Sequence, residues 1–289
     1  MRSACLLLFA CVACGSPQAP VVAAEVATVP SASNAPSAPA APTSEKKGGL
    51  VYSLPTIKSG EPLSPARFTI KVRDGALFLN GDSIAKIPAD SSHGFDAEYK
   101  RSGPNDLYLV PLADKVKAAP PQSDAAAKTV RLELAPTVSY RMLIEILFTL
   151  GQSEMTTFGI AAPSSNGQLA EIRIVPPKAA SELKSVLGLT VLATTEGIAI
   201  KARGGNVAPG CTDTGAGLAF KSEGAGYRVA DTVACLRMLK SVAVGFDDET
   251  TATFSASPGV LLPDVITLVD AIRGEKRDLF PNVFFGVSR

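Results

Sequence analysis

The sequence predicts an α+β fold: a tandem duplication of one small β-β-α-β-α-β domain, with helices packed on one face of a mixed sheet. Segments 122 residues apart share one pattern of apolar and polar residues. Within each copy, the apolar spacing changes from every second residue to every third or fourth. The first spacing is typical of a half-buried strand and the second of an amphipathic helix. A chain of 289 residues also has room for two domains of about 100–200 residues each.

Residues 1–14 have the layout of a secretory signal peptide: one basic residue, a short apolar run and small residues before a cysteine. The run is too short for a membrane-spanning helix, which needs about 20 apolar residues. Val12-Ala13-Cys14 resembles a bacterial lipobox, so we expect cleavage before Cys14 and lipid attachment to its thiol. A second register would place the lipid on Cys11, and an ordinary signal with incidental cysteines is the third interpretation. Two or three acyl chains would anchor the protein firmly.

Residues 15–48 consist mainly of Ala, Pro, Ser, Val and Thr. Such a segment cannot bury a core, and its prolines favour extended polyproline geometry. We therefore predict a semi-stiff tether, followed by a first domain at 49–178 and a second at 179–289. After the tether, no run of 18 apolar residues free of charge occurs, so the sequence predicts no membrane helix there.

Each copy is expected to begin with a β-hairpin. Residues 68–79 form two short apolar segments around Asp74-Gly75. The offset of 122 places residues 190–201 on them, with Glu196-Gly197 at the turn. An acidic residue followed by Gly between two such segments is a common hairpin signal.

Two helices and two more strands complete each copy. The second helix is amphipathic, and Arg141, Glu145 and Thr149 are expected on its outward face. In the first copy its inward residues are Tyr140, Leu143, Ile144, Leu147 and Leu150, which align without a gap on apolar residues 122 positions later. The predicted helices are 105–118, 140–150, 227–241 and 262–272, and the predicted strands are 129–134, 158–160, 251–256 and 285–287.

The hairpin, the Pro-containing entry to the second helix and the Phe-Gly strand together resemble the periplasmic domain of the biopolymer-transport proteins ExbD and TolR. The resemblance lies in Val72–Gly81, Leu132–Gly151 with Phe158–Ala161, and Thr253–Arg273 with Leu279–Val287. Members of that family normally add one transmembrane helix with an acidic residue, and they work beside a proton-channel partner. This chain departs from that pattern, so the resemblance implies no proton-pathway residue. It implies the soluble domain in duplicate, which in the family can dimerise or contact peptidoglycan.

Cys211 and Cys235 are predicted to form a disulfide. Shifted by 122 residues they fall on Ala89 and Ala113, and two small residues in the other copy suggest positions packed close together. An oxidising periplasm would favour the bond. A redox or metal pair is the competing interpretation, which is disfavoured because Cys211 and Cys235 do not form a CxxC motif.

Composition argues against catalysis. Lys and Arg total 28 and Asp and Glu total 27, and the resulting net charge of +1 implies no nucleic-acid partner. His93 is the single histidine, which disfavours a multi-histidine zinc site and any nucleophile that needs an imidazole base. We therefore predict that the protein is not an enzyme and has no catalytic, cofactor-binding or metal-binding residue and no cofactor.

Four short motifs have a chemical alternative. Asp213-Thr214-Gly215-Ala216 matches an aspartic-protease string, but that chemistry needs two carboxylates and the string occurs once. Gly204-Gly205-Asn206 and Gly224-Ala225-Gly226 lack the spacing of phosphate-binding loops, so turns are expected. Asp247-Asp248-Glu249 would hold a cation weakly at best, and a charged turn before a strand is the simpler interpretation.

These features predict a non-catalytic lipoprotein of the cell envelope that faces the periplasm, with the outer membrane favoured over the inner. Its expected role is accessory to an ExbD/TolR-like biopolymer transport or envelope energy-coupling system, including protein transport. The expected partners are a membrane proton-channel complex or peptidoglycan. The alternative is a stand-alone peptidoglycan-binding or scaffold lipoprotein. We also expect the two repeats to pair with each other within one chain.

Overall fold

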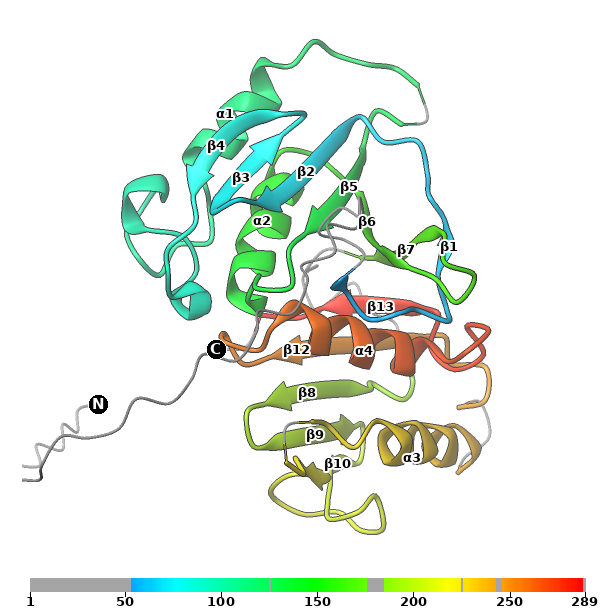
Figure 1. The fold of residues 1–289 in the computed structure, drawn as a ribbon. Coiled ribbons are helices and arrows are strands. Elements are labelled where there is room, and N and C mark those ends of the chain that lie inside the picture. The colour runs from blue at the N-terminus through cyan, green and yellow to red at the C-terminus, as the bar shows by residue number, and fades with distance from the viewer. Residues whose placement is uncertain (1–52, 125, 176–184, 225, 243–245, 288–289) are drawn as a thin grey trace, which may run out of the picture. The chain divides into compact units, whose positions relative to one another are not determined.

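Alternating apolar residues build two mixed β-sheets in the computed structural model, which describes residues 53–124, 126–175, 185–224, 226–242 and 246–287 (Figure 1). Both sheets carry α-helices, so the α+β class is confirmed. The predicted signal peptide and tether, and the predicted domain boundary at 178/179, lie outside the described residues. None of the helices in the described part of the chain combines the length and apolar character that a membrane crossing needs.

The first sheet has seven strands. The three central strands are parallel, with β2 beside β5 and β5 beside β6, and the outer pairs are antiparallel. In spatial order the strands are β1 (Glu61–Pro62), β7 (Leu169–Ile174), β6 (Thr157–Pro163), β5 (Thr129–Leu134), β2 (Phe68–Arg73), β3 (Ala76–Leu79) and β4 (Asp82–Lys86).

The second sheet has six strands. Here β8 is antiparallel to β9 and parallel to β12, and β12 is parallel to β13. The first sheet has the same arrangement, because β2 is antiparallel to β3 and parallel to β5, and β5 is parallel to β6. In spatial order the strands are β10 (Gly205–Val207), β9 (Gly197–Ala202), β8 (Thr190–Thr194), β12 (Thr251–Ala256) and β13 (Asn282–Phe285), with β11 (Phe220–Lys221) also paired to β9.

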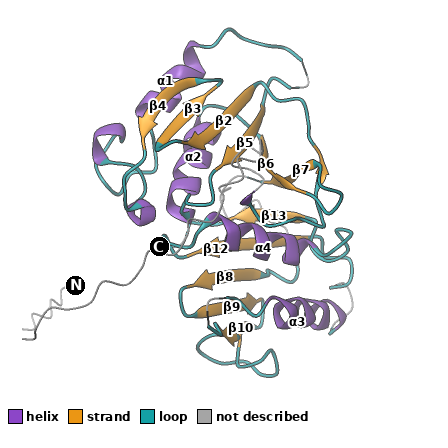
Figure 2. Cartoon of the chain, in the orientation of Figure 1, coloured by secondary structure: helices purple, strands orange, loops and turns teal. Residues whose placement is uncertain are grey.

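Four α-helices pack against these sheets (Figure 2). Helix α1 contacts α2 and β4, whereas α4 contacts α3, β12 and β13. Ser139 caps α2 by accepting a hydrogen bond from the Met142 amide at 3.3 Å, which satisfies one of the free donors of the first turn. The helices are α1 (Val110–Ala118), α2 (Tyr140–Gln152), α3 (Val229–Ser241) and α4 (Leu262–Arg273), with the short 3-10 helices η2 (Ser91–His93) and η3 (Ala97–Tyr99).

The predicted helices exist, but α1 begins five residues after the predicted start at 105. Asp106 accepts a hydrogen bond from the Tyr108 amide at 3.0 Å, which closes a local turn in place of a helical one.

The hairpin register of the second copy differs from the prediction by one residue. Arg73 pairs with Ala76 around the predicted Asp74-Gly75 turn, but Thr194 pairs with Gly197, so the second turn is Thr195-Glu196. Gly197 lies in β9 at φ +149°, and a Cβ there would collide with the β11 backbone. The glycine is therefore required by the neighbouring strand and not by the turn.

The predicted closing strand at 285–287 is also shifted. β13 ends at Phe285, and Val287 is outside it and exposed. The register Ala252↔Val283 and Phe254↔Phe285 sets this position, because it places the apolar side chains of β13 in the core.

The described residues belong to one compact unit in which the two sheets share a hydrophobic core. At their junction, Val175 directly after β7 pairs in parallel with Phe284 of β13. The Val175 amide donates to the Val283 carbonyl and the Phe285 amide donates to the Val175 carbonyl, both at 3.2 Å. The seven-stranded and six-stranded sheets thus meet along a short backbone seam.

Candidate functional site

The segments that enter α2 and α4 pair with each other. Ser139 and Leu261 form an antiparallel bridge. The Tyr140 amide donates to the Val260 carbonyl at 2.7 Å, and the Leu262 amide donates to the Val138 carbonyl at 2.8 Å. The two bonds are related by the offset of 122 residues: Tyr140 corresponds to Leu262, and Val260 corresponds to Val138. The contact between these two segments is therefore reciprocal at the offset of 122 residues.

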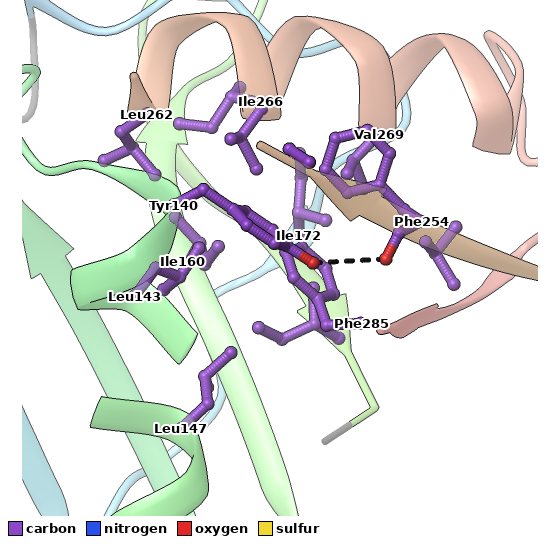
Figure 3. Close-up of a cluster of buried hydrophobic side chains, with 14 of the residues drawn as sticks. Tyr140, Leu143, Leu147, Ile160, Ile172, Phe254, Leu262, Ile266, Val269 and Phe285 are labelled. Atoms are coloured by element: carbon purple, nitrogen blue, oxygen red, sulfur yellow. Dashed lines mark hydrogen bonds between the residues drawn. The ribbon is translucent and has the colours of Figure 1, made fainter. Parts of the chain in front are cut away.

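Tyr140 occupies the shared core beneath this bridge (Figure 3). Its hydroxyl donates to the carbonyls of Gly286 at 2.6 Å and Phe254 at 3.2 Å. Its ring lies edge-on to Phe254 and stacked on Phe285, with centroids 5.8 and 6.1 Å away. Burial raises the pKa of the Tyr140 phenol above its ordinary value. A first-half side chain is thus held by backbone and aromatic groups of the second half.

The outward face of α2 is covered, which contradicts the prediction for Glu145 and Thr149. Both side chains are fully buried, and Arg141 is partly so. Glu145 accepts hydrogen bonds from Lys100 Nζ at 2.7 Å, Arg141 Nε at 2.6 Å and the Phe95 amide at 2.8 Å. The segment between β4 and α1 therefore lies on α2 and supplies charges and amides for a buried carboxylate.

The burial of Glu145 had a signal in the sequence. Met142 and Ile146, outside the predicted apolar set, are also apolar, so α2 is hydrophobic nearly all round, as in a helix buried on both sides. Gly94, at φ +81°, makes the close approach possible because a Cβ there would collide with the Glu145 carboxylate.

Cys211 and Cys235 lie at disulfide distance, with a Cα–Cα separation of 5.6 Å. Cys235 is buried in α3, and Cys211 lies in the loop between β10 and β11. The pair therefore ties that long loop to the helix. The predicted lipidation residue, Cys14, and its alternative, Cys11, lie outside the described residues.

The acidic motifs serve local structure. The Asp213 carboxylate accepts a hydrogen bond from the Thr214 amide at 2.7 Å in an exposed turn. Glu249 accepts from Ser185 Oγ at 2.8 Å and from the amides of Val186 and Thr251. Burial opposes the ionisation of Glu249, but these hydrogen bonds outweigh burial and lower its pKa. Its oxygens are thereby engaged by the chain itself.

The remaining motif residues are also accounted for. The His93 side chain is 90% exposed and lies 3.9 Å from the Asp90 carboxylate. Asn206 donates to the carbonyls of Gly215 and Gly217, which holds a loop. Ala225, in the middle of the other Gly motif, is outside the described residues. Within the described part of the chain, no group of three or more His, Cys, Asp or Glu side chains is arranged to hold a metal ion.

Among the described residues, a surface pocket of about 250 Å³ borders the junction and is lined by Tyr227, Val260 and Leu261. Two other pockets lie away from the junction. One of about 460 Å³ lies near Arg67, Lys117 and Lys128, but the Arg67 guanidinium already donates to the Ala119 and Pro120 carbonyls. The other, of about 370 Å³, lies between α3, α4 and the segment that precedes β1. The inter-half junction is therefore the best-defined candidate site, and its chemistry is that of a protein interface.

Comparison of the sequence with protein-family models and with curated proteins, and of the fold with solved structures, finds no match.

Proposed function

We propose that this protein is a lipid-anchored periplasmic binding and coupling protein, in which two ExbD/TolR-like periplasmic domains pair within one chain. Its role is accessory to a biopolymer-transport or envelope energy-coupling system, and it acts by contact and not by catalysis. The reciprocal backbone bridge between Ser139 and Leu261 is the observation that carries the proposal.

The sheet topology supports a tandem duplication. In each sheet an antiparallel hairpin lies beside a parallel strand, which lies beside a second parallel strand. In each half the amphipathic helix begins 122 residues from its counterpart, at Tyr140 and at Leu262. A dimerising domain that is duplicated in one gene can form its two-fold interface inside the chain. The bridge between Ser139 and Leu261, which are 122 residues apart, supports that proposal.

The side-chain environment supports a contact role. The carboxylates of Glu145, which is buried, and Glu61, which is 13% exposed, are paired with lysine or arginine. Asp213, in the protease-like string, is bonded to the next amide along the chain. These groups are engaged in holding the fold.

Co-purification tests the transport role. The full-length lipidated chain, extracted in mild detergent, is expected to retain an integral-membrane proton-channel partner. Cys14→Ser should move the chain from the membrane to the soluble periplasmic fraction, whereas Cys11→Ser should leave it membrane-bound. Absence of any integral-membrane partner after cross-linking in cells would contradict the accessory role.

Cell-wall binding tests the alternative of a stand-alone peptidoglycan-binding or scaffold lipoprotein. If the purified chain pellets with isolated sacculi, and does so equally when made in cells without the channel partner, the alternative replaces the accessory role.

A further inference from the structure

The pocket of about 250 Å³ that borders the junction has one charged side chain among its described lining residues, Asp264 in the first turn of α4. The other described residues that line it are neutral. One of them, Leu261, is a large apolar side chain that is 44% exposed. The pocket thus combines a partly exposed carboxylate with an apolar wall that solvent reaches.

The Asp264 carboxylate is not compensated by the described part of the chain. Burial raises its pKa above the ordinary value, and no hydrogen bond or cation among the described residues offsets that effect. The free amides of a helix N-terminus often serve a first-turn carboxylate, but here they are used elsewhere or missing. The amides of Asp264 and Val265 both donate to the Leu261 carbonyl at 3.1 Å, and the Leu262 amide donates across the junction. Pro263 has no amide proton.

The first half shows how a carboxylate at a comparable place is compensated. Helices α2 and α4 begin 122 residues apart. In α2 the Glu145 carboxylate lies 2.7 Å from the Lys100 ammonium, which also donates to the Pro104 carbonyl at 2.8 Å. Lys100 and Pro104 belong to the segment before α1, and the pocket residues Ser222 and Gly226 belong to the segment before α3.

The second half has no internal lysine at this place. The sequence offset of 122 residues puts Ser222 where the first half has Lys100, and Thr267 where it has Glu145. Asp264 lies three residues before Thr267, and residues at that spacing are neighbours on one side of a helix. The second half therefore presents a carboxylate beside an open pocket where the first half has a carboxylate and its own lysine.

We infer that this pocket receives a lysine side chain of a partner protein, with the ammonium on Asp264 and the aliphatic stem along Leu261. Lysine carries a compact charge on a flexible four-carbon stem, which matches one carboxylate beside an apolar wall. A partly buried carboxylate without a partner costs free energy, and a bound ammonium would recover it. The inference rests on the proposed contact role only for the source of the lysine, because the ammonium site depends on the pocket alone.

Titration of the purified full chain with Nα-acetyl-lysine methylamide, followed by NMR, tests the site. The probe should bind with a Kd on the order of 1–10 mM and shift the amide resonances of Gly226, Leu261 and Asp264. Nα-acetyl-norleucine methylamide has a similar stem without the ammonium and should bind at least about tenfold more weakly. The bound lysine probe should also lower the pKa of the Asp264 carboxyl, because an adjacent ammonium favours the charged form.

Three variants separate the charge of Asp264 from its surroundings. Asp264→Asn keeps the shape of the side chain and should weaken binding of the lysine probe at least about tenfold. Glu223→Gln is the matched control, because Glu223 lies beside Ser222 but is 73% exposed and pairs with Arg228 at 3.4 Å. It should change the affinity less than about twofold. Ser222→Lys supplies the lysine from within the chain, so it should compete with the probe, and it tests the site even if Asp264→Asn does not fold.

The source of the lysine is tested by carbodiimide coupling in isolated cell envelopes, which condenses a carboxylate with an adjacent amine to an amide. Mass spectrometry should find Asp264 joined to a lysine of a second protein. A product in which Asp264 carries only a small free amine would contradict a protein partner.

The lysine site is excluded if the lysine and norleucine probes bind equally, if neither shifts the pocket resonances, or if Asp264→Asn and Glu223→Gln behave alike. The outcome is separable from that of the co-purification. If the probe binds but no integral-membrane partner is retained, the site stands and the transport role falls. If a partner is retained but the probe does not bind, only the site falls.

Discussion

At the scale of single residues, Glu145 is the charge on which the first half depends most. Its carboxylate compensates Lys100, whose side chain is fully buried. Glu145→Gln keeps the shape but leaves the ammonium without a counter-charge, so we expect a loss of about 3–5 kcal/mol in the free energy of unfolding. Urea denaturation measures this loss, and a change no larger than that of Asp82→Asn, at an exposed pair with Lys115, would contradict it.

A paired replacement separates lost charge from lost packing. The double variant Lys100→Met/Glu145→Leu removes both fully buried charges, and Arg141, which is partly exposed, can turn to water. Because no unpaired buried charge remains, this variant should be more stable than Glu145→Gln. If the double variant is the less stable of the two, packing and not charge controls this site.

The raised pKa of Tyr140 predicts that the protein loses stability at alkaline pH. Its folded pKa is raised by burial above the unfolded value of about 10. Its contribution to stability is therefore complete below pH ~10 and is lost as the pH rises from there toward the folded pKa. Tyr140→Phe should be less stable than wild type by about 1–3 kcal/mol near neutral pH, because the Gly286 and Phe254 carbonyls lose the one hydroxyl hydrogen that they share. Between about pH 8 and pH 11, however, the variant should lose less stability than wild type.

Tyr227 is the control for that comparison. Burial raises its pKa to about 12, but its hydroxyl bonds within the second half, to the Thr194 carbonyl at 2.8 Å. Tyr227→Phe should also reduce the alkaline loss, with no effect on the junction. Identical pH profiles for wild type and Tyr140→Phe in urea denaturation would show that the phenol of Tyr140 is not buried in solution.

At the scale of elements, the contact between α3 and the loop from β10 to β11 depends on Cys211 and Cys235. The two cysteines are 24 residues apart, and a bridge across a loop of that size contributes about 3 kcal/mol. Alkylation of the purified chain, with and without reductant, should therefore differ by two labelled thiols. If both cysteines react without reductant, the bridge does not form.

Element positions could be predicted where they depend on local periodicity. Helices α2 and α4 begin at the predicted residues, Tyr140 and Leu262, because one apolar face and its Pro- or Ser-containing entry are encoded within a few residues. The turn at Thr195-Glu196 could not be predicted, because the glycine that follows it is required by the close approach of β11, which lies more than twenty residues later in the chain. Strand registers set by distant segments leave no trace in a local pattern.

The candidate sites were harder to predict from the sequence than the helices, because most of them depend on contacts between segments that are far apart in the chain. The cysteine pair could be predicted because the sequence pattern repeats after 122 residues, which allows Cys211 and Cys235 to be compared with Ala89 and Ala113. The burial of Glu145 depends on Lys100 and Phe95. The position of residues 59–61 depends on Asp270 and Arg273, more than two hundred residues away. Charges that meet across such separations resemble solvated surface charges when they are considered one at a time.

At the scale of the whole molecule, we propose that two like domains form a two-fold pair inside one chain. The bridge between Ser139 and Leu261 joins residues that are 122 positions apart, which supports that pairing. The hydrogen bonds of its neighbours make this a non-hydrogen-bonded pair, for which Cα atoms are typically about 4.5 Å apart, within disulfide range. The geometry therefore offers a cross-link that reports on the pairing itself.

The most direct measurement is oxidation of the Ser139→Cys/Leu261→Cys chain. In this chain Cys5, Cys11 and Cys14 are replaced by serine, so that Cys211 and Cys235 are the only other cysteines. We predict that the two new thiols join within one chain, giving a product of monomer size without reductant and a cross-linked peptide that mass spectrometry assigns to positions 139 and 261. Disulfide-linked dimers, or two thiols that stay free under conditions that oxidise Cys211 and Cys235, would contradict the intramolecular pair.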